Sequence, residues 1–141
     1  MADTWQLEQT LETTTGRERA WEYWSDMQNH AEMENVKIEL DGPFSTGTKG
    51  RTISSNNTQE WELSEVVPKK RFVITGKDGA FSLSFAWDFY DEGTGTKMTQ
   101  RIQAEGPTPV MEQWEGVFRQ MEETAAQNMQ RLANRLDELS R

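Results

Sequence analysis

Apolar and polar residues alternate along much of the chain, a pattern typical of half-buried β-strands. The alternation begins with Trp5, Leu7 and Leu11, which are separated by polar residues and predict a strand over residues 3–12. Further along, one face of the segment 80–91 carries five large apolar side chains, and its other face is mostly polar. The same period predicts a strand that contains Val36, Ile38 and Leu40, and others over residues 47–54, 58–67, 70–77 and 95–105.

Short polar segments separate the later predicted strands. They are Ser55-Asn56-Asn57, Pro68-Lys69, Asp78-Gly79 and Glu92-Gly93-Thr94-Gly95, all compatible with hairpin turns. A parallel return would need a crossover of about a dozen residues or more, so these short connections predict antiparallel neighbours. The basic cluster Lys69-Lys70-Arg71 falls in one of the turns and is best interpreted as solvated. The sequence therefore predicts an antiparallel meander.

Two segments show helical spacing instead of alternation. Ala20, Trp21 and Trp24 belong to an apolar stripe that predicts two short helices within residues 16–33. From Thr108-Pro109 onwards, apolar residues recur every three or four positions almost to the C-terminus, which predicts a long helix with Thr108 as its N-cap. A sheet with one apolar face needs a cover, and only this helix is large enough to supply it. A sheet that curls around the helix would leave a pocket between them.

Length and composition favour one folded domain over residues 1–141. Leu, Ile, Val and Phe account for only 24 of the 141 residues, a low share for a folded chain. Six Trp and seven Met offset this deficit, because each is a large residue when buried. We therefore expect a core rich in aromatic and Met side chains, which can wall a cavity as readily as fill one.

Charge and residue types exclude several classes of function. The formal net charge of −9 disfavours binding to nucleic acid or to anionic lipid surfaces. The absence of cysteine excludes disulfides and thiolate zinc sites, and a lone histidine excludes a histidine-rich metal site. The chain contains neither an apolar N-terminal run nor a segment long enough to span a membrane. We expect an acidic cytoplasmic protein without stable membrane insertion, metal or cofactor.

Four short motifs in a fixed order carry a resemblance to a known family. They are Ala20-Trp21-Glu22-Tyr23-Trp24-Ser25-Asp26; Leu40-Asp41-Gly42-Pro43-Phe44 followed by Gly47-Thr48-Lys49-Gly50; Glu65-Val66-Val67-Pro68 before Arg71-Phe72; and Gly95-Thr96-Lys97-Met98-Thr99 before Glu105-Gly106-Pro107. With these motifs the chain resembles, over nearly its whole length, the START-like superfamily. This superfamily is also called SRPBCC, or polyketide cyclase/dehydrase and lipid-transport proteins. The sequence departs from the family pattern at Met33, where an aromatic residue, usually Trp, is expected near the cavity mouth.

The resemblance implies an α+β helix-grip fold. In that fold a curved antiparallel sheet of about seven strands wraps around a long C-terminal helix, and two short helices follow the first strand. It also implies a cavity for a hydrophobic ligand between sheet and helix. The alternation and the helical spacing indicate which side chains face it, with ordinary core packing as the competing interpretation of each apolar residue. The candidate ligand-binding residues are Phe72, Ile74, Phe81, Leu83, Phe85, Trp87, Met98, Gln100, Ile102, Trp114, Phe118 and Met121.

Few residues are candidates for catalysis. Gln100 is notable because it shares an apolar strand face and needs a polar partner there, whereas Lys97, Thr99 and Arg101 point outward. The lone histidine, His30, could act as a general base, against a surface or capping role at a helix end. Two acidic residues near the predicted pocket, Asp26 and Glu32, could move a proton, against a cap or a solvated surface group.

The leading functional hypothesis is a noncatalytic binder or carrier of a small hydrophobic molecule, lipid-like or polyketide-like. An enzyme of the polyketide cyclase or dehydratase type, using the same cavity with Gln100, Asp26 or His30, is the alternative. A second alternative is a stress or chaperone-type interaction protein that docks a partner on its long helix or sheet edge. The identity of the ligand stays open, as does the choice between a monomer and a homodimer formed through an edge strand near residues 36–54.

Overall fold

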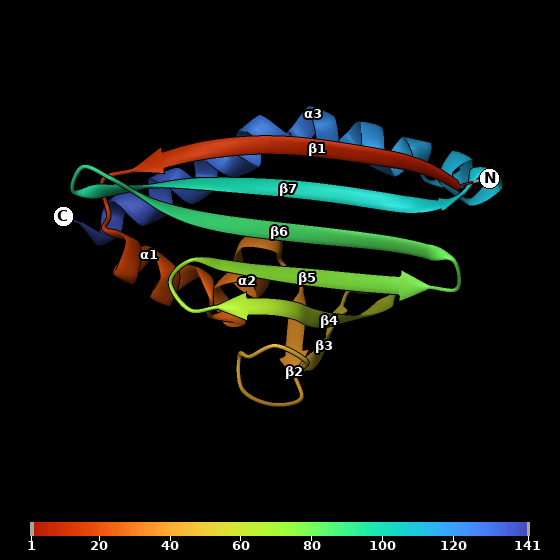
Figure 1. The fold of residues 1–141 in the computed structure, drawn as a ribbon, viewed down its shortest axis with the longest axis horizontal. Coiled ribbons are helices and arrows are strands. Elements are labelled where there is room, and N and C mark those ends of the chain that lie inside the picture. The colour runs from red at the N-terminus through yellow and green to blue at the C-terminus, as the bar shows by residue number, and fades with distance from the viewer. Residues whose placement is uncertain (1, 141) are drawn as a thin grey trace.

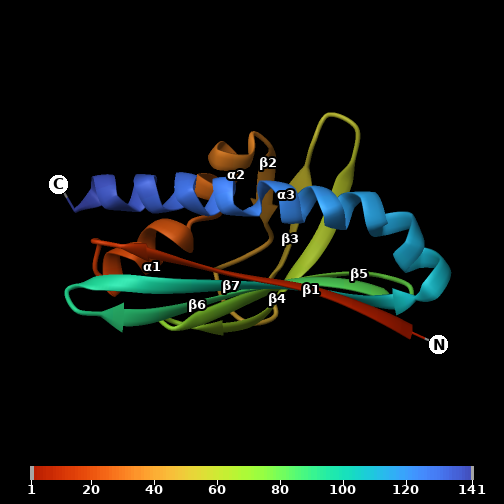
Figure 2. The ribbon, with the colours of Figure 1, turned by 90° about the horizontal axis from the view of Figure 1, so that it is seen from above.

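One antiparallel sheet carries the helices on a single side in the computed structural model, which describes residues 2–140 (Figures 1 and 2). The strands lie in the order β1-β7-β6-β5-β4-β3-β2, so β1 pairs with β7 while the remaining neighbours follow one another along the chain. The elements are β1 (Ala2–Thr13), α1 (Arg17–Trp24), α2 (Met27–Glu34), β2 (Lys37–Leu40), β3 (Lys49–Ile53), β4 (Thr58–Val67), β5 (Arg71–Asp78), β6 (Phe81–Glu92), β7 (Gly95–Pro107) and α3 (Thr108–Leu139).

This architecture is the helix-grip fold, and the predicted fold class is confirmed. The seven-stranded sheet, the two short helices after β1 and the long C-terminal helix are all present. The start of α3 differs slightly from the prediction, because Pro107 occupies the N-cap position that was expected for Thr108. Pro107 has φ −59° and ψ 145°, which continue the extended backbone of β7 up to the first helical residue.

Turn residues explain why the meander folds back at the predicted positions. Gly79 and Gly93 have φ values of 62° and 60°, a left-handed conformation that side chains with a Cβ rarely adopt. Lys69 also has a positive φ, 67°, and its Nζ lies 3.2 Å from the Glu18 carboxylate. Lys69 and Lys70 therefore lie in a surface turn as predicted, whereas Arg71 is the first residue of β5 and bonds the Asp88 carboxylate.

Most of the core lies between the sheet and the C-terminal half of α3. At its centre is Phe72, which is fully buried among the aromatic rings of Trp21, Phe44 and Phe89. Leu132 and Leu136 of α3 close this cluster from the helix side. None of the helices within residues 2–140 is long and apolar enough to span a membrane.

A smaller cluster packs the N-terminal half of α3 against the other end of the sheet. The ring of Phe118 stacks on Trp5 at a centroid distance of 4.4 Å, and Trp114 stacks on Phe81 at 4.7 Å. Met111 completes the cluster. The long helix is thus anchored to the sheet near both of its ends.

Buried polar contacts fasten the end of β1 to the last turns of α3. The hydroxyl of Thr15 donates a hydrogen bond to the carbonyl of Leu136, and that of Thr13 donates one to the Asp137 carboxylate. The hydroxyl of Thr96, on β7, donates to the carbonyl of Thr15 at 2.7 Å. These bonds satisfy three buried threonines and fix the register of helix against sheet.

Candidate functional site

A cavity of about 370 Å³, here called the inner cavity, lies between the sheet and the middle of α3. Its floor is formed by side chains of β1, β6 and β7, and its roof by residues of α3. The C-terminal residues of α1 and α2 close one side, where Trp24, Met33 and Glu34 contribute. Met33 therefore lines the cavity at the position where the family resemblance implies an aromatic residue, and its main-chain carbonyl accepts a hydrogen bond from Arg131 Nη2 at 3.0 Å.

A second hollow of about 510 Å³, here called the end cavity, lies beside the N-terminal half of α3. Side chains of β4, β5 and β6 form its wall, and Trp114 of α3 covers it. Phe85, on β6, lines both cavities. Its ring is thus the shared wall between two spaces beneath the same helix.

The structure places most of the predicted ligand-binding residues around these two cavities. Three others, Phe72, Met98 and Phe118, are 0–5 % exposed, belong to the packed clusters and line neither cavity. For these three, the competing interpretation of core packing describes their surroundings. The residues on the inner cavity are Phe85, Trp87, Gln100, Ile102 and Met121. Those on the end cavity are Ile74, Phe81, Leu83, Phe85 and Trp114.

Gln100 occupies the position that its strand register predicts. It lies on the inner face of β7, opposite Gln9 of β1, and both half-buried side chains line the inner cavity. Neither amide group has a hydrogen-bond partner among residues 2–140. A polar side chain on an apolar face is costly without a partner, so this pair offers free donors and acceptors to a bound molecule.

His30 is buried rather than placed at the surface or at a helix cap, which corrects one expectation. Its ring stacks on Trp24 at a centroid distance of 3.5 Å, and Nε2 donates a hydrogen bond of 2.6 Å to the Trp24 carbonyl. Burial lowers the pKa of His30 from 6.5 to about 4, against the smaller opposing effects of that hydrogen bond and of Asp26. His30 lines neither cavity. The imidazole therefore packs the wall behind Trp24 and faces neither of the cavities that a substrate would enter.

Asp26 and Glu32 also lie away from the cavities. The Asp26 carboxylate accepts a hydrogen bond from the Gln28 amide at 3.0 Å and caps the N-terminus of α2. Glu32 is exposed on the same helix and lines neither cavity. The cap and surface interpretations therefore describe these two residues better than proton transfer does.

Glu34 is the acidic residue of the inner cavity, and nothing in its sequence position singles it out. As the last residue of α2, it has a solvent-exposed side chain that also lines the cavity, and the protein packed around it raises the pKa of its carboxyl by desolvation. No hydrogen bond or ion pair to Glu34 occurs within the described part of the chain. The chain has 24 acidic residues, and only the fold, which brings the end of α2 close to α3, shows that Glu34 lines the cavity.

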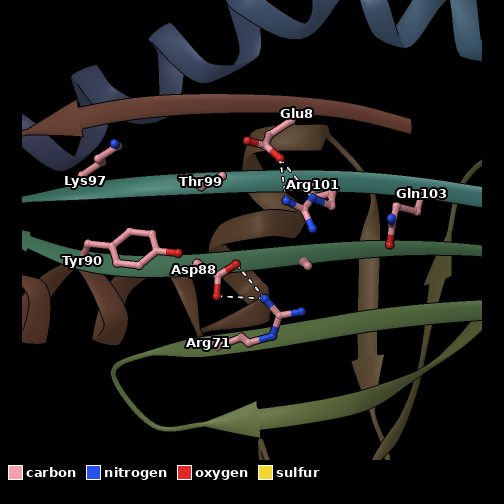
Figure 3. Close-up of a pocket in the computed structure, with 9 residues that line it drawn as sticks. Glu8, Arg71, Asp88, Tyr90, Lys97, Thr99, Arg101 and Gln103 are labelled. Atoms are coloured by element: carbon pink, nitrogen blue, oxygen red, sulfur yellow. Dashed lines mark hydrogen bonds and ion pairs between the residues drawn. The ribbon is translucent and has the colours of Figure 1, made fainter. Parts of the chain in front are cut away.

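A polar groove of about 530 Å³ on the opposite, outer face of the sheet has a different character (Figure 3). Arg71 makes paired hydrogen bonds of 2.8 and 2.7 Å to the Asp88 carboxylate, and Arg101 bonds Glu8 at 2.8 Å. The predicted outward orientation of Lys97, Thr99 and Arg101 is confirmed. The walls of the groove consist mostly of solvated charged side chains that already have partners. The groove is therefore a weaker candidate for ligand binding than the inner cavity.

The Arg101–Glu8 ion pair is expected to add little stability, because both side chains are about half exposed. Arg101→Ala should lower the free energy of unfolding by less than about 1 kcal/mol. Urea unfolding of the variant beside the unchanged protein measures this difference. A loss several times larger would mean that the outer face contributes more than a solvated surface.

The comparisons with known proteins agree with this fold. A truncated norcoclaurine synthase from Thalictrum flavum is similar, with a TM-score of 0.74 at 11% identity over 99% of this chain and 94% of that chain. A putative uncharacterized protein from Rhizobium leguminosarum gives a TM-score of 0.70 at 16% identity over 96% and 97%. At these identities the similarity establishes the fold alone.

The di-domain ARO/CYC protein StfQ of the steffimycin biosynthetic pathway is also similar, with a TM-score of 0.75 at 12% identity. The match covers 97% of this chain and 52% of that one. No curated protein matches the chain. The family model described as polyketide cyclase/dehydrase and lipid transport matches residues 4–139. Together with the helix-grip architecture, that match shows that the chain belongs to the polyketide cyclase/dehydrase and lipid transport family.

Proposed function

We propose that this protein binds a small, largely apolar molecule in the inner cavity. The observation that carries the proposal is the cavity itself, whose volume of about 370 Å³ is bounded mainly by aromatic and aliphatic side chains. This volume lies within the range of about 300–1,000 Å³ that is typical of small-molecule sites. Entry of an apolar ligand would be favourable, because each Å² of apolar surface removed from water lowers the free energy by about 25 cal/mol.

The chemistry of the cavity wall supports a binder that accepts more than one shape. Met33, Met121 and Met129 line it, and unbranched thioether side chains adapt to different ligand outlines at small cost. Membership in a family that includes lipid transport is consistent with such a role. The lining thus favours an apolar body as the main feature of the ligand and sets few constraints on its outline.

A second candidate function is catalysis of the cyclase or dehydratase type. One observation favours it: the Glu34 carboxyl, with its raised pKa, lines the same cavity as Gln9 and Gln100. A carboxyl tuned in this way is suited to general acid–base work. Binding remains the first proposal, because neither His30 nor Asp26 lines the cavity and Glu34 therefore lacks a second acid–base group there.

Native mass spectrometry of the purified protein, followed by denaturing extraction, tests the binding proposal. The expected result is one apolar small molecule per chain, or, for protein purified empty, saturable binding of the neutral fluorescent probe Nile red. An empty protein that also fails to bind Nile red would contradict the proposal and would favour the alternative of a protein-interaction module.

Filling the inner cavity from the helix side is expected to weaken ligand binding. Ala125 of α3 lines the cavity, so the ring of Ala125→Phe would occupy ligand space and should weaken Nile red binding by about tenfold, or ~1.4 kcal/mol. The neighbouring Ala126 is exposed and lines neither cavity, so Ala126→Phe is the matched control and should bind as the unchanged protein does. Fluorescence titration measures both, with circular dichroism to check folding. Equal affinities for the two variants would place the binding site elsewhere.

A further inference from the structure

The polar groups of the inner cavity limit what kind of molecule it can hold. Glu34 lines the cavity without a hydrogen bond or ion pair to any residue of the described chain. Its side chain is exposed, yet the protein around it partly desolvates the carboxylate, and no described residue compensates for that loss. The group therefore gains more from a positively charged partner than from any neutral one.

The basic residue of the cavity does not neutralise Glu34. Arg131 lines the same space, but its guanidinium donates to the Met33 carbonyl at 3.0 Å and forms no ion pair with the Glu34 carboxylate. The net charge of −9 adds an attractive field for cations over the whole molecule. A positive group that enters the cavity thus meets an available carboxylate.

Aromatic rings complete a surface that suits a cation. Trp24 and Trp87 line the cavity together with Phe85, and the two indoles meet edge to face at a centroid distance of 5.5 Å. The faces of Trp rings attract ammonium groups, and this attraction strengthens where water is excluded. One face of Trp24 is already covered by the His30 ring at 3.5 Å, so Phe85 and Trp87 are the rings that remain to meet a cation beside the carboxylate.

We propose that the molecule bound in the inner cavity carries a protonated amine that pairs with Glu34, joined to an apolar or aromatic body that fills the remaining space. This inference rests on the proposed function and specifies the class of its ligand. The amides of Gln9 and Gln100, on the sheet side, would serve a second polar group of the same molecule. A ligand with a carboxylate in place of the amine would meet the unpaired charge of Glu34 and be repelled.

Three probes that share one aromatic body test the proposal. Isothermal titration calorimetry at pH 7.5 compares 1-naphthylmethylamine, which is cationic, with the neutral 1-naphthalenemethanol and the anionic 1-naphthoic acid. The amine is expected to bind roughly tenfold more tightly than the alcohol, and the acid more weakly than both. An amine that binds no better than the alcohol would overturn the proposal.

A pair of variants on one helix identifies the responsible charge. Glu34→Gln should reduce the preference for the amine over the alcohol to within about twofold, chiefly by weakening the binding of the amine. Glu32→Gln removes the same charge two residues away on α2, outside the cavity, and should keep the full preference. An equal loss in both variants would assign the preference to the general field of the protein and contradict a specific pairing with Glu34.

The outcomes separate this proposal from the proposed function. If all three probes bind with similar affinity and Ala125→Phe weakens each of them, the cavity is a ligand site and only the amine assignment fails. If no probe binds and Nile red does not bind either, the proposed function itself fails. Within residues 2–140 Glu34 forms no hydrogen bond or ion pair, so its replacement is not expected to cause unfolding.

Discussion

Phe72→Ala is expected to lower the free energy of unfolding by about 3–5 kcal/mol, the range for removing a large aromatic side chain from a packed core. The ring is fully buried, with centroids 5.2 Å from Phe44, 5.8 Å from Trp21 and 6.2 Å from Phe89. Because these three neighbours lie on α1, on β6 and on the loop between β2 and β3, they cannot all move into the space that the ring leaves. Urea unfolding monitored by circular dichroism measures the loss.

Phe85→Ala is the matched comparison for this experiment. Phe85 is half-buried and already borders open space on two sides, since it lines both cavities. Removing the Phe85 ring should lower the stability less than removing that of Phe72, and it should alter which ligands bind. Phe72→Ala should leave the preference among ligands unchanged under conditions in which the variant is folded. Equal losses of stability in the two variants would contradict the separation of core from cavity wall.

Acidification from pH 7 to below pH 4 is expected to remove about 3 kcal/mol of stability through His30 alone. The folded protein keeps the imidazole neutral down to a pKa of about 4, whereas the unfolded chain takes up the proton near pH 6.5. The unfolded state therefore binds more protons between these values. The contribution is fully present above pH 6.5, falls as the pH drops and is lost below pH 4.

His30→Gln isolates this effect, because glutamine does not titrate. The difference in unfolding free energy between the two proteins should change by about 3 kcal/mol from pH 7 to pH 4, and the quantity to compare is this pH dependence rather than the absolute stability. Urea titrations at intervals of half a pH unit provide the measurement. Parallel pH profiles for the two proteins would show that the imidazole is solvated and not packed against Trp24.

The positions of the strands could be predicted from the sequence because alternate residues of a half-buried strand face different surroundings. Leu7 and Ile102 point to the helix side and Glu8 and Arg101 to solvent, as their positions in the alternation require. The long spacing pattern from Thr108 onwards likewise predicts α3, since a single apolar stripe must meet a sheet.

Which inward-facing residue packs the core and which lines a cavity does not follow from that alternation. Phe72 and Ile74 lie two positions apart on one face of β5, yet the former is enclosed by aromatic rings and the latter lines the end cavity. The difference depends on where α1 covers the sheet. The same holds for Glu34 and His30, whose surroundings are set by how α2 packs and not by their spacing in the chain.

The pairing of β1 with β7 has a consequence for how the chain folds. Every partner of β1 in the sheet lies beyond residue 95, and its other main contact is α3, so these contacts close loops of roughly a hundred residues. Such long closures slow folding relative to chains built from local contacts. During synthesis, an amphipathic N-terminal strand must wait without a partner until almost all of the sheet has emerged. The length of chain between β1 and β7 therefore sets the time during which β1 is most open to mispairing or to capture by a chaperone.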